Sequence, residues 1–115
     1  MNNLDFSKKK RLTSLNFNLI FSNSKKLHNE FFIILSKFNK IKYSRVGIII
    51  PKKIIYKTNI RNKFKRIIRE YFRLNQYSFL IMDYIFIIKN KNILKINNFY
   101  FKKNLENIWN FFKKK

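Results

Sequence analysis

The sequence predicts an α/β domain, more narrowly an α+β two-layer sandwich, in which helices pack on a small sheet in the order α-β-β-α-β-α. Three observations predict this class. Two β-rich segments follow each other in the first half, an amphipathic helix comes next, and a third apolar strand precedes a second amphipathic helix. With 115 residues the chain suffices for one compact domain and is too short for two ordinary ones. We therefore treat residues 1–115 as a single domain.

The first expected element is a short helix after a basic lead. Thr13 or Ser14 can cap its start, and Phe17 and Phe21 then fall one turn apart on the same face. Such a pair can stack on unpaired bases or pack into a core. Spacing alone favours the core.

The next two elements are strands over residues 30–38 and 45–55, both rich in β-forming residues. The polar segment between them predicts a hairpin connection, which would make the two strands adjacent. Pro51 cannot donate a ladder hydrogen bond, so the second strand should become irregular near it.

The clearest element is a helix over residues 58–75. Apolar residues recur there at intervals of three and four and predict one buried stripe, made of Ile60, Phe64, Ile67, Ile68, Tyr71 and Leu74. At 100° per residue the remaining arc is basic and comprises Arg61, Asn62, Lys65, Arg66, Arg69 and Arg73. This arc is roughly 18 Å long, enough to meet several phosphates, and its contacts would not be sequence-specific.

A third strand over residues 84–89 and a last amphipathic helix complete the chain. The apolar face of that helix is marked by Phe101, Leu105, Ile108, Trp109 and Phe112. Strand, helix and strand over residues 45–89 are long enough for a parallel crossover, which the usual rule makes right-handed.

Charge narrows the class of partner. The chain has 27 Lys and Arg against 5 Asp and Glu, a net charge of +22, and such a domain repels itself unless it meets a polyanion. Hydrophobic residues make up 46% of the chain, which argues against disorder. No apolar run approaches the roughly 20 residues of a membrane span, and no secretory signal is visible. With no Cys, disulfides and zinc fingers are excluded, and we expect a cytoplasmic protein without a membrane partner.

The acidic residues and the single histidine do not predict an active site in the protein. The five carboxylates show no paired spacing, and His28 has no cysteine or glycine-rich phosphate loop near it in sequence. Glu70 stands four residues after Arg66 and three before Arg73, which favours local ion pairs over catalysis.

Two segments carry a family resemblance. RVGIIIPKK at residues 45–53 and RNKFKRIIREYFR at residues 61–73 resemble the signature region of the bacterial ribonuclease P protein. That family carries an arginine-asparagine-arginine core and then lysine-arginine and arginine-glutamate pairs, positions held here by Arg61, Asn62, Lys65, Arg66, Arg69 and Glu70. Lys63 replaces the third arginine, which keeps the charge and loses the planar fork. The similarity extends to residues 12–21, residues 82–90 and the last helix.

The resemblance implies a subunit of a tRNA-processing endoribonuclease whose active site lies in its RNA. It implies two partners, the catalytic RNA and precursor tRNA, and no obligate protein partner. Magnesium is expected with the RNA subunit, with no cofactor or metal bound by the protein alone. It also implies a left-handed crossover, against the usual rule.

Two sets of site residues follow from the resemblance. Phe17 and Phe21 match the aromatics of a cleft for the 5′ leader of precursor tRNA. The expected RNA-binding residues are Arg45, Lys52, Lys53, Arg61, Asn62, Lys63, Lys65, Arg66, Arg69 and Arg73.

The main alternative is a structural ribosomal protein, because size, charge and fold class would suit ribosomal RNA equally well. The order of motifs separates the two hypotheses, since a ribosomal protein has no need of the basic signature together with the earlier phenylalanine pair. A basic membrane-active protein is unfavoured, because the amphipathic helices are needed to cover the sheet.

Overall fold

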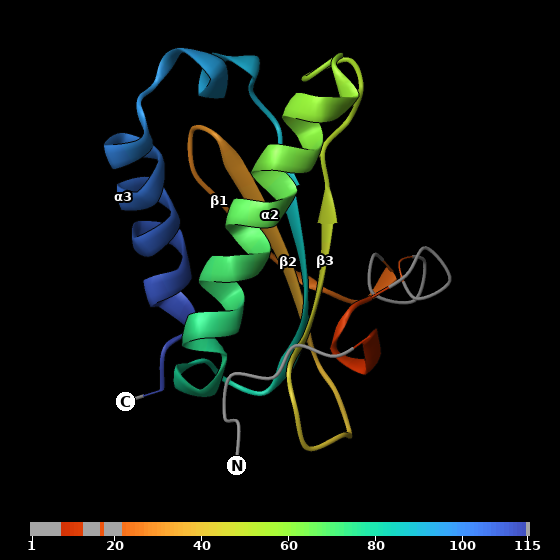
Figure 1. Cartoon of the computed structure of the whole chain (residues 1–115). Helices are drawn as coiled ribbons and strands as arrows, with labels where there is room; N and C mark the ends of the chain where they lie inside the picture. Colours follow the sequence, from red (N-terminus) through yellow and green to blue (C-terminus); the bar gives the residue numbers. More distant parts are fainter. Residues whose placement is uncertain (1–7, 13–16, 18–21, 115) are drawn as a thin grey trace.

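A computed structural model of the chain describes residues 8–12, 17 and 22–114. Four strands form one sheet in the order β1-β2-β4-β3, and two helices cover one of its faces (Figure 1). The elements are β1 (Lys25–His28), β2 (Phe32–Phe38), β3 (Arg45–Ile49), α2 (Thr58–Asn75), β4 (Met82–Ile88) and α3 (Asn98–Trp109). The predicted mixed α/β class is confirmed. Neither described helix is long and apolar enough to cross a bilayer.

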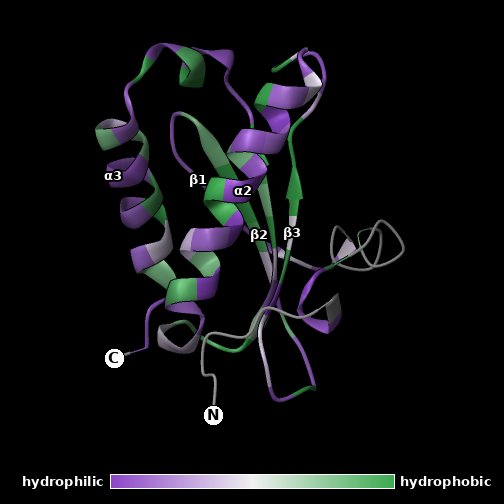
Figure 2. Cartoon of the chain, in the orientation of Figure 1, coloured by the Kyte–Doolittle hydropathy of each residue, from purple (hydrophilic) through white to green (hydrophobic). Residues whose placement is uncertain are grey.

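The main core lies between the sheet and the two helices. Side chains alternate along each strand, so β4 directs Tyr84 and Phe86 toward the helices. Trp109 of α3 stacks on Phe86, with ring centroids 6.0 Å apart, and meets Tyr84 edge-on at 5.0 Å. Apolar residues of α2 and α3 lie in this core or pack against it, and Figure 2 shows them interspersed with hydrophilic residues along both helices. The predicted apolar face of the last helix is confirmed.

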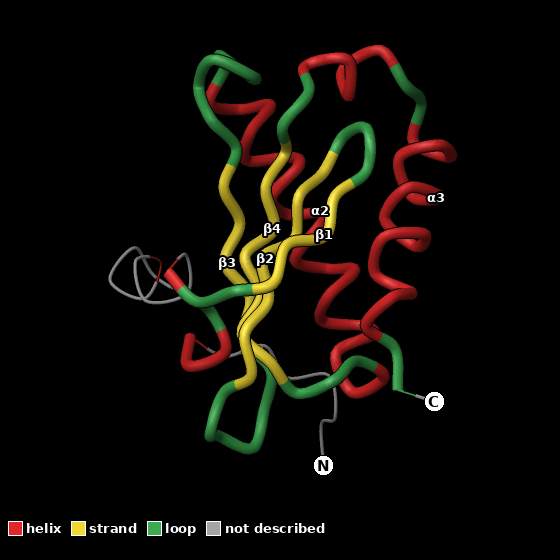
Figure 3. Tube along the Cα trace, turned by 180° about the vertical axis from the view of Figure 1, so that it is seen from behind, coloured by secondary structure: helices red, strands yellow, loops and turns green. Residues whose placement is uncertain are grey.

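A smaller cluster lies on the opposite face of the sheet, which we call the second face (Figure 3). Leu35 and Ile85 are buried there, and Leu12 of the N-terminal segment covers them. Phe17, Ile33, Ile49 and Ile87 pack around this cluster. Much of the second face carries no helix among the described residues.

The prediction that residues 30–38 and 45–55 form adjacent strands is wrong. β4 lies between β2 and β3, antiparallel to the first and parallel to the second. The physical reason is burial, since β4 is buried along nearly its whole length and a strand apolar on both faces belongs in the centre of a sheet. The parallel crossover from β3 through α2 to β4 is confirmed, and its left-handed sense stays a prediction.

Most element boundaries agree with the sequence. The central helix has the predicted limits, whereas the strand predicted over residues 45–55 ends at Ile49, before Pro51. The Pro51 carbonyl accepts hydrogen bonds from the amides of Ile54 and Ile55, at 2.9 and 3.1 Å, and so forms a turn. The short edge strand β1 was not predicted. The first helix falls largely outside the described residues, as does Phe21.

Five of the six residues of the predicted stripe of α2 lie in the main core or pack against it, namely Ile60, Phe64, Ile67, Ile68 and Tyr71. The most buried residues of α2 are Ile68, Phe72 and Arg61, while Leu74 is 51% exposed. The buried face is therefore rotated toward Arg61 and Phe72, because α2 packs on the edge of the sheet beside β3 and leaves its other flank facing α3.

Candidate RNA interface

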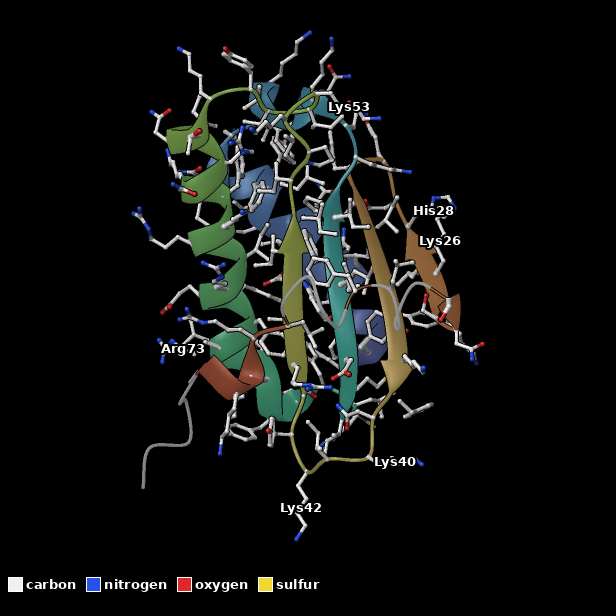
Figure 4. All side chains as sticks on the ribbon, turned by 90° about the vertical axis from the view of Figure 1, so that its right-hand side faces the viewer. Lys26, His28, Lys40, Lys42, Lys53 and Arg73 are labelled. Atoms are coloured by element: carbon white, nitrogen blue, oxygen red, sulfur yellow. The ribbon has the colours of Figure 1, made fainter. Side chains whose placement is uncertain are left out.

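One side of α2 carries a row of polar and cationic side chains that we call the basic flank, made of Asn62, Lys65, Arg66, Arg69 and Arg73. Asn62 and Arg66 are exposed, and the others are half-buried. α2 lies beside β3, and Arg73 projects near the end of the helix in a view onto the second face (Figure 4). The basic flank and the second face are therefore neighbouring surfaces.

Arg11 brings a further cation to this flank. Residue 11 pairs with Val46 in an isolated bridge, and the amide of Leu12 donates to the Val46 carbonyl at 2.9 Å. Burial, and next the Arg11 guanidinium, lower the pKa of Arg69. Two like charges therefore lie close together on this flank. Sequence reasoning left Arg11 out of the site, although the basic run KKKR at residues 8–11 was a signal for it.

Arg73 shares its charge with Glu70. The Arg73 guanidinium donates to both carboxylate oxygens, at 2.6 and 3.1 Å. This hydrogen bonding lowers the pKa of Glu70 and raises the pKa of Arg73. The predicted local ion pair is confirmed for these two residues. Arg73 therefore offers RNA a partly neutralised cation, in contrast to the more exposed Arg66.

The expectation that Arg61 lies on the exposed arc is wrong. Its side chain is buried, with 9% of the residue exposed. One terminal nitrogen donates to the carbonyls of Ile55 and Tyr56 at 2.9 and 2.7 Å, and the other donates to the Thr58 hydroxyl at 3.1 Å. Arg61 therefore ties the loop before α2 to the first turn of the helix. Its position, seven residues before Ile68, puts it on the helix face that packs on the sheet.

The Arg45 side chain also forms its main contacts within the protein. Its guanidinium forms a two-pronged pair with Asp83 of β4, at 2.8 and 2.6 Å, and Asn39 donates to the same carboxylate at 3.0 Å. Hydrogen bonding to Asp83 raises the pKa of Arg45. About a quarter of the Arg45 side chain stays exposed. Arg45 thus joins β3 to β4 and presents only one edge to a ligand.

The remaining expected cations are exposed. Lys52 and Lys53 lie in the turn after Pro51, and Lys63 lies on the first half of α2. Lys53 stands at one end of the sheet and Lys40 and Lys42 at the other, while Lys26 marks the outer edge (Figure 4). Cations therefore surround the second face.

Phe17 lies on that face against Gly47, the only glycine in the chain. A Cβ atom on residue 47 would be 2.6 Å from Cε1 of Phe17 and 3.2 Å from Cβ of Leu12. Such distances are too short for a side chain, so the absence of one lets the aromatic ring approach the strand. Phe17 is half-buried, which leaves part of it open. A lone glycine inside a predicted strand was the signal for this close approach.

The groove between α2 and α3 brings two carboxylates together. Glu70 and Glu106 both line a groove of ≈ 430 Å³, with Tyr71 between the two helices. A general acid would need a raised carboxyl pKa, and that of Glu70 is lowered by Arg73. No cluster of three metal-ligating side chains is found within the described residues. In this groove Glu70 is held in an ion pair with Arg73.

Comparisons with known proteins point to one family. The family model for ribonuclease P matches residues 6–113. The ribonuclease P protein component of Baumannia cicadellinicola is 43% identical over 107 residues, covering 92% of each chain.

Two solved structures have the same fold. The RNase P protein from Thermotoga maritima aligns with a TM-score of 0.79 at 32% identity, and the alignment covers 90% of this chain and 98% of that protein. The RNase P protein from Staphylococcus aureus aligns with a TM-score of 0.81 at 27% identity, and the alignment covers 89% of this chain and 94% of that protein. The ribosomal alternative is not favoured. The match along nearly the whole sequence and the shared fold show that this chain belongs to the family of ribonuclease P protein components.

Proposed function

We propose that the chain is the protein subunit of ribonuclease P in the bacterial cytoplasm, where it binds the catalytic RNA and the 5′ leader of precursor tRNA. It assists the endonucleolytic removal of that leader, which gives the mature 5′ end. Family membership supports the assignment, and the observation that carries the division of labour is the adjacency of the basic flank to the second face.

The basic flank is the proposed contact with the catalytic RNA. Arg66, which is exposed on α2, and Arg69, beside Arg11, supply charge that neutralises phosphates and releases counterions. Lys63, Lys52 and Lys53 extend the positive surface toward the start of α2. Arg61 and Arg45 contribute indirectly, because their hydrogen bonds within the protein hold the loop and the strands from which the other cations project.

The second face is the proposed site for the leader. Phe17, seated on Gly47, offers an aromatic surface for an unpaired base, and we assign Phe21 to the same cleft from the family motif. The surrounding lysines favour the leader's phosphates. The protein supplies charge and grip, while hydrolysis and the magnesium ions that assist it are assigned to the RNA subunit.

The test is reconstitution at low magnesium. Purified protein, a bacterial ribonuclease P RNA and a precursor tRNA are mixed, and cleavage is compared with that by the RNA alone. The proposal expects the protein to raise the rate and to tighten binding of leader-bearing substrate more than of mature tRNA. A rate that does not change over a wide range of protein concentration would overturn it.

Phe17→Leu, with Phe99→Leu as a matched control, then tests the leader site. Phe99 is 63% exposed on α3, away from the second face. Phe17→Leu should weaken binding of the leader-bearing substrate and leave binding of mature tRNA unchanged. Phe99→Leu should leave the affinity for both substrates unchanged.

A further inference from the structure

Two exposed phenylalanines border one hollow at the end of the sheet where β2 finishes. Phe38 is 69% exposed and Phe111 is 72% exposed. Both line a hollow of ≈ 240 Å³ together with Lys25, Leu80 and the buried Met82. This hollow is smaller than the roughly 300–1,000 Å³ of pockets for drug-sized ligands, so it suits a single ring system.

A second hollow adjoins the first. It has a volume of ≈ 320 Å³ and is lined by Asn23 and Lys37. Lys25, Ser36, Phe38 and Met82 line both hollows. Phe38 therefore borders two neighbouring spaces, as a ring between successive stacked groups would.

The position of Phe111 is fixed by the core. Its ring packs edge-on against the buried Phe112, with centroids 5.5 Å apart and planes at 77°, and Phe112 in turn packs on Tyr84. The backbone is pinned as well, because the Leu80 amide donates to the Phe112 carbonyl at 2.8 Å and the Lys114 amide to Ser78 at 2.7 Å. The aromatic surface thus exists before any ligand arrives, which lowers the entropic cost of binding.

The charge around the rings has one sign. Lys25 and Lys26 line the first hollow and Lys37 the second, while no described carboxylate lines either of them. The groove between α2 and α3 is different, since Glu70 and Glu106 line it. Exposed aromatic faces among lysines are the features by which proteins hold single-stranded nucleic acid, with bases stacked on rings and phosphates near cations.

The edge strand β1 connects these hollows to the second face. Successive residues of a strand point to opposite faces, so Lys25 and Lys26 direct their side chains to different sides of the sheet. Lys26 pairs with Leu35, which belongs to the second-face cluster. Lys26 and His28 project at the outer edge of the sheet (Figure 4). A single strand that leaves the second face across β1 would therefore meet Lys26, then Lys25 and the two rings.

We propose that Phe38 and Phe111 form a second stacking site, which holds unpaired nucleotides of the leader beyond those on the second face. This inference rests on the proposed function and adds a distal subsite to it. The longest dimension of the protein is 37 Å, and an unpaired leader must follow the surface from the second face to reach these rings. Only leaders that continue past the second face would reach the distal subsite.

The test compares substrates in the reconstituted ribonucleoprotein. Binding is measured for a precursor with a long leader that extends past the second face, for one with a leader confined to the second face, and for mature tRNA. One variant combines Phe38→Leu with Phe111→Leu. The control is Phe99→Leu, which removes a different exposed ring, the one over which the Lys103 ammonium lies. We expect the double variant to lose roughly tenfold in affinity per lost stack for the long leader alone, and the control to match the wild type.

Crosslinking gives an independent readout of position. The chain has no cysteine, so Asn23→Cys provides a unique thiol for a photoreactive label beside the second hollow. The expected crosslinks fall on leader nucleotides far from the cleavage site.

Several results would overturn the distal subsite. These are an unchanged affinity for the long leader, an equal loss for all three substrates, or crosslinks to the catalytic RNA. Sedimentation showing self-association that the double variant abolishes would mean that the rings meet a second copy of the chain. If the wild type itself does not distinguish leader-bearing from mature tRNA, the proposed function fails first, and the subsite fails with it.

Discussion

Gly47 and Phe17 are in contact across the second face, at a distance that leaves no room for a methyl group on residue 47. We expect Gly47→Ala to displace the ring of Phe17. Because the displaced atoms are the far end of a side chain, stability should fall by about 1 kcal/mol, the lower part of the range for overpacking. Affinity for a leader-bearing substrate should fall by roughly 1–3 kcal/mol, the size of a lost base stack.

The control for this prediction is a double-mutant cycle with Phe17→Leu. Chemical denaturation and binding of leader-bearing and mature tRNA are measured for the two single variants and for the combination. The two substitutions should be strongly coupled in leader binding, because both act through the same ring. Additive effects on leader affinity would show that Gly47 and Phe17 contribute separately.

Arg66 and Arg61 should respond in opposite ways to truncation. Arg66 is exposed on the basic flank, so Arg66→Ala should preserve stability and lower the slope of log affinity for the catalytic RNA against log salt by about one unit. Arg61→Ala leaves the buried carbonyl of Ile55 without its donor, and we expect a loss of about 1–3 kcal/mol in unfolding free energy.

Salt-dependent binding and denaturant unfolding, measured on both variants, check this contrast. Arg61→Lys serves as a further control, because it keeps the charge and removes the fork that reaches two carbonyls and the Thr58 hydroxyl. It should stay destabilised. A stable Arg61→Ala protein with a reduced salt slope would return Arg61 to the RNA contact surface.

The difference between these two arginines also shows how far the sequence could predict the site. Helical spacing gave the limits of α2, because apolar residues at intervals of three and four leave little doubt about a helix. Spacing could not show that the buried face includes Arg61, since a charged residue is ordinarily assigned to solvent. Its burial depends on two carbonyls of the loop before the helix and on the Thr58 hydroxyl in the first turn, and these acceptors have no pattern of their own in the sequence.

The order of strands was similarly out of reach of local reasoning. Residues 30–38 and 45–55 are separated by a short polar connection, and neighbours in sequence are usually neighbours in a sheet. β4 nevertheless lies between them, because its side chains are apolar on both faces and gain most from a central position. The pairing of Arg45 with Asp83 follows from this order alone, since it joins β3 to β4.

Tyr71 should make stability depend on pH in the alkaline range. Burial, and secondarily Glu106, raise its pKa from 10.0 to about 12. Between these values the unfolded chain loses the phenolic proton and the folded protein keeps it, so the folded state binds more protons and stability falls as pH rises. Below pH 10 the contribution is fully present. Burial also raises the pKa of Tyr84, so both tyrosines contribute to the pH dependence of the wild-type unfolding free energy.

The difference between Tyr71→Phe and the wild type isolates the contribution of Tyr71. Unfolding free energy is measured by denaturant at steps from pH 9 to pH 12, and the variant should lose stability less steeply above pH 10. Tyr100→Phe, on the exposed side of α3, is the matched control and should follow the wild type. Identical slopes for all three proteins would contradict the assignment.

The proximity of Arg11 and Arg69 predicts that an anion acts as a folding ligand. The chain carries a net charge of +22, and the lowered pKa of Arg69 reflects burial and repulsion by Arg11 on one flank. An anion that binds the folded state and not the unfolded chain raises stability in proportion to the logarithm of its concentration above the dissociation constant. We therefore expect incomplete folding at low ionic strength and a rise in Tm as sulfate is added. Circular dichroism measures both effects.

The effect should depend on the two arginines and not on net charge in general. Arg69→Gln removes one of the facing cations, so it should raise Tm at low salt and flatten the response to sulfate. Lys103→Gln removes the same charge from an exposed position on α3 and should leave the response near that of the wild type. Sulfate also stabilises proteins by exclusion from their surface, and this general effect is common to all three proteins. Equal responses from Arg69→Gln and Lys103→Gln would therefore reduce the effect of sulfate to exclusion and screening, with no anion site between Arg11 and Arg69.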